Sequence, residues 1–194
     1  MRVPVVLLAL LLSASGCAPY AVIEPARTRI GDSYSVDPQI RWTSLGEGGR
    51  TELWTVDGPA LQSLRFMKDV GDGQSLLGRS VSSEEREVPE DKQPRFRATM
   101  TPTEIVELVA DTWSLFGASK IRATGLRPAK FGTVDGFRFE LAFVWGDGAE
   151  AEATAAGAVI KQRLQLIMYS GTRLYYFDKY RVTVDRLLES IHVD

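Results

Sequence analysis

Histidine and cysteine are almost absent from this sequence of 194 residues, which contains one of each, and asparagine is missing entirely. Because Cys17 is the only cysteine, no disulfide can form within the chain. His192 lies two residues from the C-terminus, where chain ends are usually exposed and frayed. The sequence therefore favours neither a Cys-His nor a Ser-His-Asp catalytic site, and it lacks the ligands of a zinc site.

Catalytic and metal-binding motifs are also missing. The chain contains no G-x-S-x-G, S-x-x-K, H-E-x-x-H or Walker A spacing. Two acidic glycine stretches, "DVGDG" (69–73) and "WGDGAE" (145–150), superficially suggest calcium loops. Counting from Asp69, however, the alternate positions are glycines and the twelfth is Ser80, so the EF-hand ligand pattern fails. We expect no metal and no cofactor, and read Asp-Gly as a favoured turn pair.

Neither sign of charge is in large excess, since 23 basic and 25 acidic residues give a formal net charge of −2. That balance gives no basic footprint for DNA or RNA, and it excludes the usual nucleic-acid-binding classes. The apolar fraction of 44% is ordinary for a globular domain. The length after removal of a signal is enough for one domain of this kind.

The longest apolar run lies at the start of the chain. Arg2 precedes the uncharged stretch 5–12, and the small residues 13–16 follow it. A helix of that length is far shorter than the ~30 Å hydrocarbon core of a bilayer. The pattern is typical of a secretory signal peptide.

The segment "LSASGC" (12–17) resembles the lipobox of bacterial lipoproteins. The resemblance implies cleavage between Gly16 and Cys17, a diacylglycerol group on the Cys17 sulfur, and a fatty acid such as palmitate on the new amine. Two or three such chains hold a protein on a membrane far better than one. Ala18 stands where an Asp would retain a lipoprotein at an inner membrane, so the resemblance implies the outer membrane, facing the periplasm, in a host with two membranes.

Three other interpretations of this segment stay open. Ala14 and Gly16 also satisfy ordinary signal cleavage, which would release a soluble secreted protein with a free thiol. Cys17 could be a buried core cysteine, or the whole segment could remain uncleaved as an anchor. Lipidation is favoured because a lone thiol in an oxidising compartment is a liability that acylation removes.

Composition divides the chain into three parts: a signal peptide (1–16), a tether (17–37) and a single globular domain (38–194). The tether is expected because 18–38 is mixed, polar and punctuated by proline and glycine, and its later part could dock on the domain. Inside the domain, 68–94 is expected to be a long irregular loop. Its charge and serine content, as in "SSEEREVPEDKQP", favour disorder.

Period-two patterning predicts several strands. "GFRFELAFVW" (136–145) places aromatic and aliphatic residues on one side and Arg138 and Glu140 on the other. "ELWTVDGPALQSLRF" (52–66) and "RLQLIMYSGTRLYYFDKY" (163–180) read as hairpins that turn at Asp57-Gly58 and Ser170-Gly171. "RFRATM" and "KIRATGL" are further candidates, whereas the Ala-rich stretch 149–158 reads as a loose hairpin end.

Two helices are legible. Thr101, Pro102 and Glu104 form a capping-box signature, and the apolar stripe that follows ends at Gly117. A second helix is predicted over about 183–191 from its spacing of apolar residues. Hairpin-connected strands with a central and a C-terminal helix predict the α+β class: a twisted, mostly antiparallel sheet packed by the two helices.

This order of elements resembles the PsbP-like and DcrB-like group of secreted α/β/α sandwich domains. The resemblance covers roughly 38–194 and rests on element order. It implies an accessory or binding role in an envelope or a membrane complex, because members of that group are mostly not known as enzymes.

Two surfaces are candidate binding sites. Tyr175, Tyr176, Phe177 and Tyr180 are expected on one strand and its exit, as a possible partner surface if exposed and as core if helices cover both faces. Five cations could gather as an anion-binding face, although a solvated, ion-paired face is favoured; they are Arg122, Arg138, Lys161, Arg163 and Arg173.

The sequence thus predicts a lipid-anchored envelope lipoprotein whose domain binds or scaffolds and does not catalyse. Its expected partners are the membrane, through Cys17, and possibly an envelope protein, with no nucleic acid. One alternative is an envelope hydrolase that uses paired carboxylates, Glu140 with Asp147 or Glu150. Another is an accessory subunit of a larger envelope complex.

Overall fold

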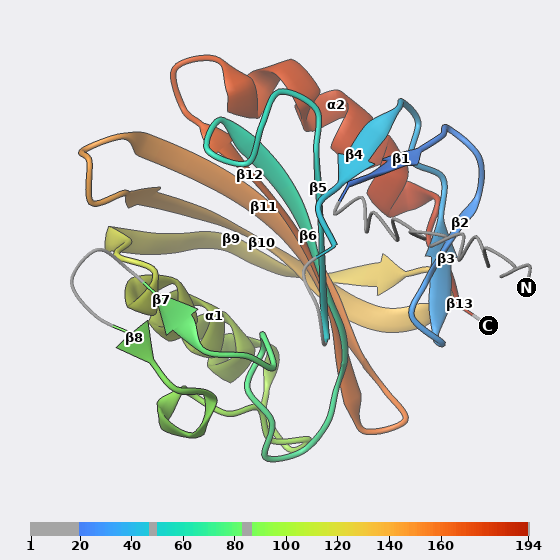
Figure 1. Cartoon of the computed structure of the whole chain (residues 1–194). Coiled ribbons are helices and arrows are strands. Elements are labelled where there is room, and N and C mark those ends of the chain that lie inside the picture. The colour runs from blue at the N-terminus through green and yellow to red at the C-terminus, as the bar shows by residue number, and fades with distance from the viewer. Residues whose placement is uncertain (1–19, 47–49, 83–86, 194) are drawn as a thin grey trace, which may run out of the picture.

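A large antiparallel sheet flanked by one helix on each face makes up most of the molecule (Figure 1). The computed structural model describes residues 20–46, 50–82 and 87–193. The sheet has eight strands in the order β1-β4-β5-β6-β12-β11-β10-β9. Their bounds are β1 Ala21–Ile23, β4 Trp42–Ser44, β5 Thr51–Thr55, β6 Gln62–Val70, β9 Ser119–Phe131, β10 Val134–Val144, β11 Glu150–Ile160 and β12 Arg163–Thr172. The predicted α+β class with a mostly antiparallel sheet is confirmed.

Strand β10 shows why the sheet forms. Phe137, Phe139, Leu141 and Phe143 alternate as buried side chains, whereas Arg138 and Glu140 point to the opposite face. The β5–β6 hairpin also forms as predicted. Its turn contains Gly58, whose φ of +108° is a conformation that side chains with a Cβ rarely adopt.

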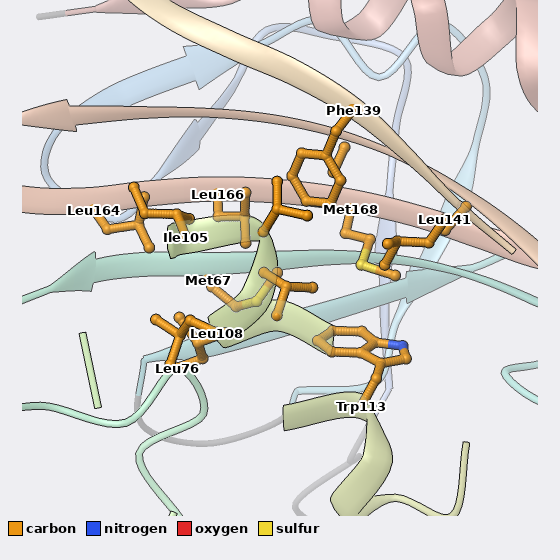
Figure 2. Close-up of a cluster of buried hydrophobic side chains, with 14 of the residues drawn as sticks. Met67, Leu76, Ile105, Leu108, Trp113, Phe139, Leu141, Leu164, Leu166 and Met168 are labelled. Carbon is orange, nitrogen blue, oxygen red and sulfur yellow. The ribbon is translucent and has the colours of Figure 1, made fainter. Parts of the chain in front are cut away.

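Helix α1 (Pro102–Leu115) begins with the predicted capping box. The Thr101 hydroxyl accepts a hydrogen bond from the Glu104 N–H, and the Glu104 carboxylate accepts one from the Thr101 N–H. The buried stripe of the helix packs on one face of the sheet, hereafter the α1 face. Figure 2 shows Ile105, Leu108 and Trp113 of α1 among apolar side chains from the sheet.

The opposite face, hereafter the α2 face, is covered by helix α2 (Tyr176–Glu189) and by a second sheet. That sheet has the order β13-β3-β2, with β2 Thr28–Ile30, β3 Tyr34–Val36 and β13 His192–Val193 (Figure 1). Ile30, Tyr34 and Val36 are 0% exposed, and the Tyr34 ring packs edge-on to Phe131 at 5.1 Å.

The tether prediction is therefore wrong for the earlier part of 21–36, which contains β1, whereas the expectation that its later part docks on the domain is confirmed by β2 and β3. These strands are only three residues long and are separated by proline and glycine, so the composition of the segment resembles that of a linker. The segment nevertheless folds onto the domain, because three of the segment's apolar side chains lie in the core of the α2 face.

The second predicted hairpin is also wrong. Ser170 and Gly171 do not turn the chain; they continue β12 and pair with Ser63 and Gln62 of β6. The chain turns only after Thr172, and the aromatic run that follows enters α2. That helix therefore begins seven residues before the predicted Thr183, and Val184, Leu187 and Leu188 form its buried side as expected.

The Ala-rich stretch is a further correction, because 150–160 form the buried strand β11 between β10 and β12. Its small side chains leave room for large neighbours: a Cβ added at Gly157 would lie 2.9 Å from the Phe137 ring. "KIRATGL" lies within β9 as predicted. "RFRATM" is not a strand, since only Arg95 forms an isolated bridge, to Ser75.

The expectation of disorder over 68–94 is wrong for the residues described there. The segment contains β7 (Val81–Ser82), β8 (Glu87–Val88) and the short helix η1 (Glu90–Lys92). Leu76, Leu77 and Val81 are completely buried in the core of the α1 face. Among the helices that the structure describes, none is long and apolar enough to span a membrane.

Candidate binding groove

A groove opens on the α1 face where three chain segments meet at one end of the large sheet. They are the β5–β6 turn, the β10–β11 turn and the C-terminal end of α1. The groove encloses a volume of about 300 Å³. That is the lower end of the size range of small-molecule pockets, which is roughly 300–1,000 Å³.

Aromatic side chains form the walls of the groove. Trp113 and Phe116 come from the last turn and C-cap of α1 and pack edge-on at 6.0 Å. Gly117 follows at a φ of +87° and ends the helix, which leaves the Phe116 ring at the end of α1. Trp145 comes from the opposite side and packs edge-on to Phe143 at 4.9 Å.

The floor is polar. Ser63 of β6 lies opposite Ser170 of β12, and their hydroxyl oxygens are 3.2 Å apart. Arg65 lies two residues further along β6, and its guanidinium carbon is 6.0 Å from the centre of the Trp113 ring and 5.7 Å from that of Phe116. These distances are typical of a cation–π contact, so Arg65 is held between the helix and the sheet.

One carboxylate lies at the lip. Asp147 in the β10–β11 turn accepts a hydrogen bond from the Ala149 N–H at 2.9 Å. The turn is closed by the Trp145 N–H, which donates to the Ala149 carbonyl. On the other side, the Thr172 N–H donates to the Leu61 carbonyl at 3.0 Å and fixes the β5–β6 turn against β12.

The charges that line the groove balance, since Arg65 and Asp147 carry one of each sign. Ser63, Ser170 and Thr172 add three hydroxyl groups to the lining of the groove. Flat apolar walls over a floor of hydroxyls suit a small ligand with an apolar face and polar edge groups.

The predicted lipidation and cleavage residues, Cys17 and Gly16, lie outside the described residues. The predicted partner surface is divided by the structure. Phe177 and Tyr180 are 2% and 8% exposed and belong to the core of the α2 face, so they are not surface residues. Tyr175 is 57% exposed at the start of α2, beside Leu174, which is 97% exposed.

A hydrogen-bonded cluster ties α2 to the β5–β6 turn on the α2 face. The Lys179 ammonium and the Tyr180 hydroxyl both donate to the Asp57 carboxylate, at 2.8 and 2.6 Å. The bond from Lys179, followed by that from Tyr180, lowers the pKa of Asp57 below its ordinary value. Burial raises the pKa of Tyr180, and the bond to Asp57 raises it further. These bonds hold α2 against the β5–β6 turn, on the opposite side of the sheet from the groove.

Among the carboxylates of the hydrolase hypothesis, the sheet separates Glu140 from Asp147, whereas Glu150 lies on the same face as Glu140, further along the neighbouring strand. Glu140 faces α2 and pairs with Arg181 at 3.2 Å, and Glu150 pairs with Arg173 at 3.0 Å. Asp147 instead borders the groove on the α1 face. The structure therefore does not bring Glu140 and Asp147 together in one cleft.

The five cations of the proposed anion-binding face do not form one surface, although Arg122 and Arg173 border the same hollow together with Glu150. Arg138 pairs with Asp185 of α2 at 3.0 Å, and Arg173 pairs with Glu150 and Glu152. Lys161 and Arg163 lie at the β11–β12 turn, where Arg163 donates to the Asp69 carbonyl. The ion-paired, solvated interpretation is confirmed for Arg173; Arg138 is ion-paired too, but its side chain is only 18% exposed and is largely buried against α2. Sequence reasoning missed the groove, whose signal was two tryptophans, each placed where a helix or strand ends.

Comparisons with known proteins place the fold. No protein-family model matches the chain, and no curated protein matches it significantly. The solution structure of cyanobacterial PsbP from Synechocystis sp. PCC 6803 matches 93% of this chain and 96% of its own, with a TM-score of 0.50 and 12% identity. LpqN of Mycobacterium tuberculosis, described as involved in cell envelope biogenesis, matches 90% of each chain with a TM-score of 0.38 and 6% identity. The similarity to PsbP supports a PsbP-like α/β sandwich fold, as the order of elements had implied.

Proposed function

We propose that this chain is a lipid-anchored envelope protein whose domain binds a small ligand in the groove and does not catalyse. The anchor is supported by the lipobox-like segment before Cys17. The binding function is supported by one observation above all: Trp113, Phe116 and Trp145 surround paired hydroxyls in a concave, partly solvent-accessible site. Trp113 is 4% exposed and backs the site, so Phe116 and Trp145, which are only partly buried, supply the aromatic surface that a ligand could contact.

The ligand is a neutral ring that carries hydroxyl groups, such as one sugar unit of an envelope polymer. A wholly apolar ligand would cover the Ser63 and Ser170 hydroxyls without replacing their contacts with water, which costs free energy. An anion would meet the Asp147 carboxylate at the lip, and a cation would meet Arg65. A single ring also suits a volume of about 300 Å³.

Titration with N-acetylglucosamine and its short oligomers, followed by tryptophan fluorescence and by NMR, tests the groove. We expect binding by the wild type and at least a tenfold loss of affinity in Trp145→Ala. Leu126→Ala, on the distant strand β9, is the matched control and should bind normally. Equal binding by all three proteins, or none by any, would contradict the proposed ligand.

The non-catalytic assignment has its own test. The same oligomers are incubated with the protein and analysed by mass spectrometry. We expect them to remain intact. Cleavage that disappears in Asp147→Asn would establish an enzyme and overturn this part of the proposal.

The anchor is tested by the intact mass of protein extracted from membranes, beside a Cys17→Ser variant. We expect the mass of acyl chains on the wild type, cleavage before Cys17, and an uncleaved, unmodified variant. Recovery of the wild type from aqueous fractions with a free thiol would overturn the anchor. In a host with two membranes, separation of the membranes should place the protein in the outer one.

The exposed pair Leu174 and Tyr175 favours a second candidate function, that of an accessory subunit of an envelope complex. A photo-crosslinking residue at position 174 should then give one defined adduct in membranes, with none from position 126. Leu174→Asp should abolish co-purification of the same protein. Adducts that do not differ between the two positions would argue against this function.

A further inference from the structure

The chain between the proposed anchor and the folded domain is very short. Strand β1 begins at Ala21, four residues after Cys17. Four residues extend at most about 14 Å. A lipid on Cys17 would therefore hold β1 close to the bilayer, and the tether expected over 17–37 does not separate the domain from the membrane.

The strand that would meet the bilayer has an apolar surface. β1 is an edge strand, paired only with β4 in the large sheet of the described residues. Val22 of β1 and Tyr20, which directly precedes the strand, are 61% and 62% exposed, so both side chains reach solvent. Tyrosine favours the boundary between hydrocarbon and water, because its ring is apolar and its hydroxyl is polar.

Charge distribution agrees with this orientation. Residues 18–23, "APYAVI", include no charged side chain. The first charged side chain after Cys17 is Glu24, and its charge is balanced by an ion pair with Arg41 at 3.1 Å. A charged strand at this point would resist contact with the membrane, because desolvating an ion is costly.

We infer that the β1 edge lies directly on the lipid surface, with Tyr20 and Val22 in the interfacial layer. The inference rests on the proposed anchor at Cys17. The groove is built on β6, β12 and β11, the third to fifth strands from β1. At a spacing of about 4.8 Å between strands, these lie about 14 to 24 Å away along the sheet. The groove is thus separated laterally, along the sheet, from the strand that would contact the lipid.

Site-directed labelling of the full lipidated chain in vesicles of phosphatidylethanolamine and phosphatidylglycerol tests this orientation. Acylation consumes the Cys17 thiol, so Val22→Cys and Leu126→Cys each carry one reactive thiol. Leu126 is a matched control because it is also partly exposed but lies on β9, the opposite edge of the sheet. Both side chains are exposed, so a nitroxide label should leave the fold intact, which circular dichroism checks.

We expect the label at position 22 to be several-fold more accessible to oxygen than to a water-soluble nickel complex, and the label at 126 to show the reverse. The intact mass of the same samples separates two kinds of failure. Protein without acyl chains would overturn the anchor and the proposed function. Acylated protein with an aqueous label at position 22 would overturn only the orientation, as would lipid contact at both positions.

Discussion

The two faces of the large sheet are covered in different ways. The α1 face carries one helix and an irregular segment, and its end stays open as a groove lined by Trp113, Phe116 and Trp145. The α2 face carries a helix and a second sheet, and its interior is filled by large rings such as Trp42, Trp54 and Tyr169.

The difference separates stability from binding. On the α2 face, tryptophan is buried among other rings and its free energy of burial stabilises the fold. On the α1 face, Trp145 is only partly buried, so part of its surface remains accessible to a ligand. Trp113 is buried on the α1 face as well, so the contrast concerns Trp145, for which we propose a binding role.

The largest effect is expected from Trp54→Ala. Trp54 is 0% exposed, packs against Phe66 at 4.5 Å and donates its indole N–H to Glu52 at 2.7 Å. Removing a buried tryptophan of this kind costs about 3 to 5 kcal/mol of unfolding free energy, as urea denaturation would measure. Trp145→Ala should cost less than half as much. An equal or larger loss of stability in Trp145→Ala would contradict the claim that tryptophan contributes less to stability at the groove than on the α2 face.

A smaller effect is expected from Gly171→Ala in β12. A Cβ at this position would lie 2.8 Å from the Phe177 backbone nitrogen at the start of α2, and backbone cannot move aside as a flexible side chain can. We expect a loss of about 1 to 3 kcal/mol. Gly146→Ala, in the turn beside the groove, meets no atom within 4 Å and should change stability by less than about 0.5 kcal/mol. Thermal unfolding of both variants distinguishes a close-packed face from an open end.

Next in size is Asp69→Asn, which tests a polar contact on the α2 face. Ser33 and Gln165 donate to the Asp69 carboxylate at 2.6 and 2.7 Å. Burial raises the pKa of Asp69, but these bonds, with one from the Asp32 backbone, outweigh it and leave the pKa below the ordinary 3.8. Because Asp69 is partly exposed, we expect a loss of only about 1 kcal/mol at neutral pH.

The lowered pKa of Asp69 fixes the pH dependence of this loss. A carboxyl whose pKa is lower in the folded state stabilises the fold above its unfolded pKa, and this contribution is lost as the pH falls through the folded value. The stability gap between wild type and Asp69→Asn should therefore be constant above about pH 5 and should narrow below pH 4. Urea denaturation across this range measures it. A gap that widened in acid would show that the assigned hydrogen bonds are wrong.

The smallest effect is expected from Tyr34→Phe. The Tyr34 hydroxyl is buried and has no hydrogen-bond partner within the described part of the chain, and burial raises its pKa. Removing it should leave stability unchanged or raise it by up to about 1 kcal/mol. In Tyr169→Phe, by contrast, the lost hydroxyl donates to the Tyr176 carbonyl, and we expect a loss of about 1 kcal/mol. A clear loss in Tyr34→Phe would reveal an unseen partner on the α2 face.

Sequence reasoning succeeded where a periodic pattern was long. The alternation in β10, the capping box of α1 and the apolar spacing at 184, 187 and 188 were each read correctly. These signals are local: they depend on which side of a strand or helix is buried. The fold class followed from them because hairpins favour an antiparallel sheet.

The errors occurred where tertiary contacts override local signals. Ser170-Gly171 resembles a turn, yet Gly171 is needed in a strand to make room for α2. The Ala-rich strand β11 has little strand propensity and forms because its neighbours need small residues. The groove was not foreseen because its parts lie far apart in the sequence, from Pro59 to Thr172.

The pairing of β3 with β13 joins the first and last parts of the described chain, since Ser35 lies opposite His192. The small sheet is thus complete only once the final residues are present. In a chain that is made from its N-terminus, β3 lacks its β13 partner until His192 and Val193, more than 150 positions downstream of Tyr34 and Ser35, have been added. The β3–β13 pair therefore cannot form before these residues are present, so the small sheet depends on contacts between the two ends of the described chain.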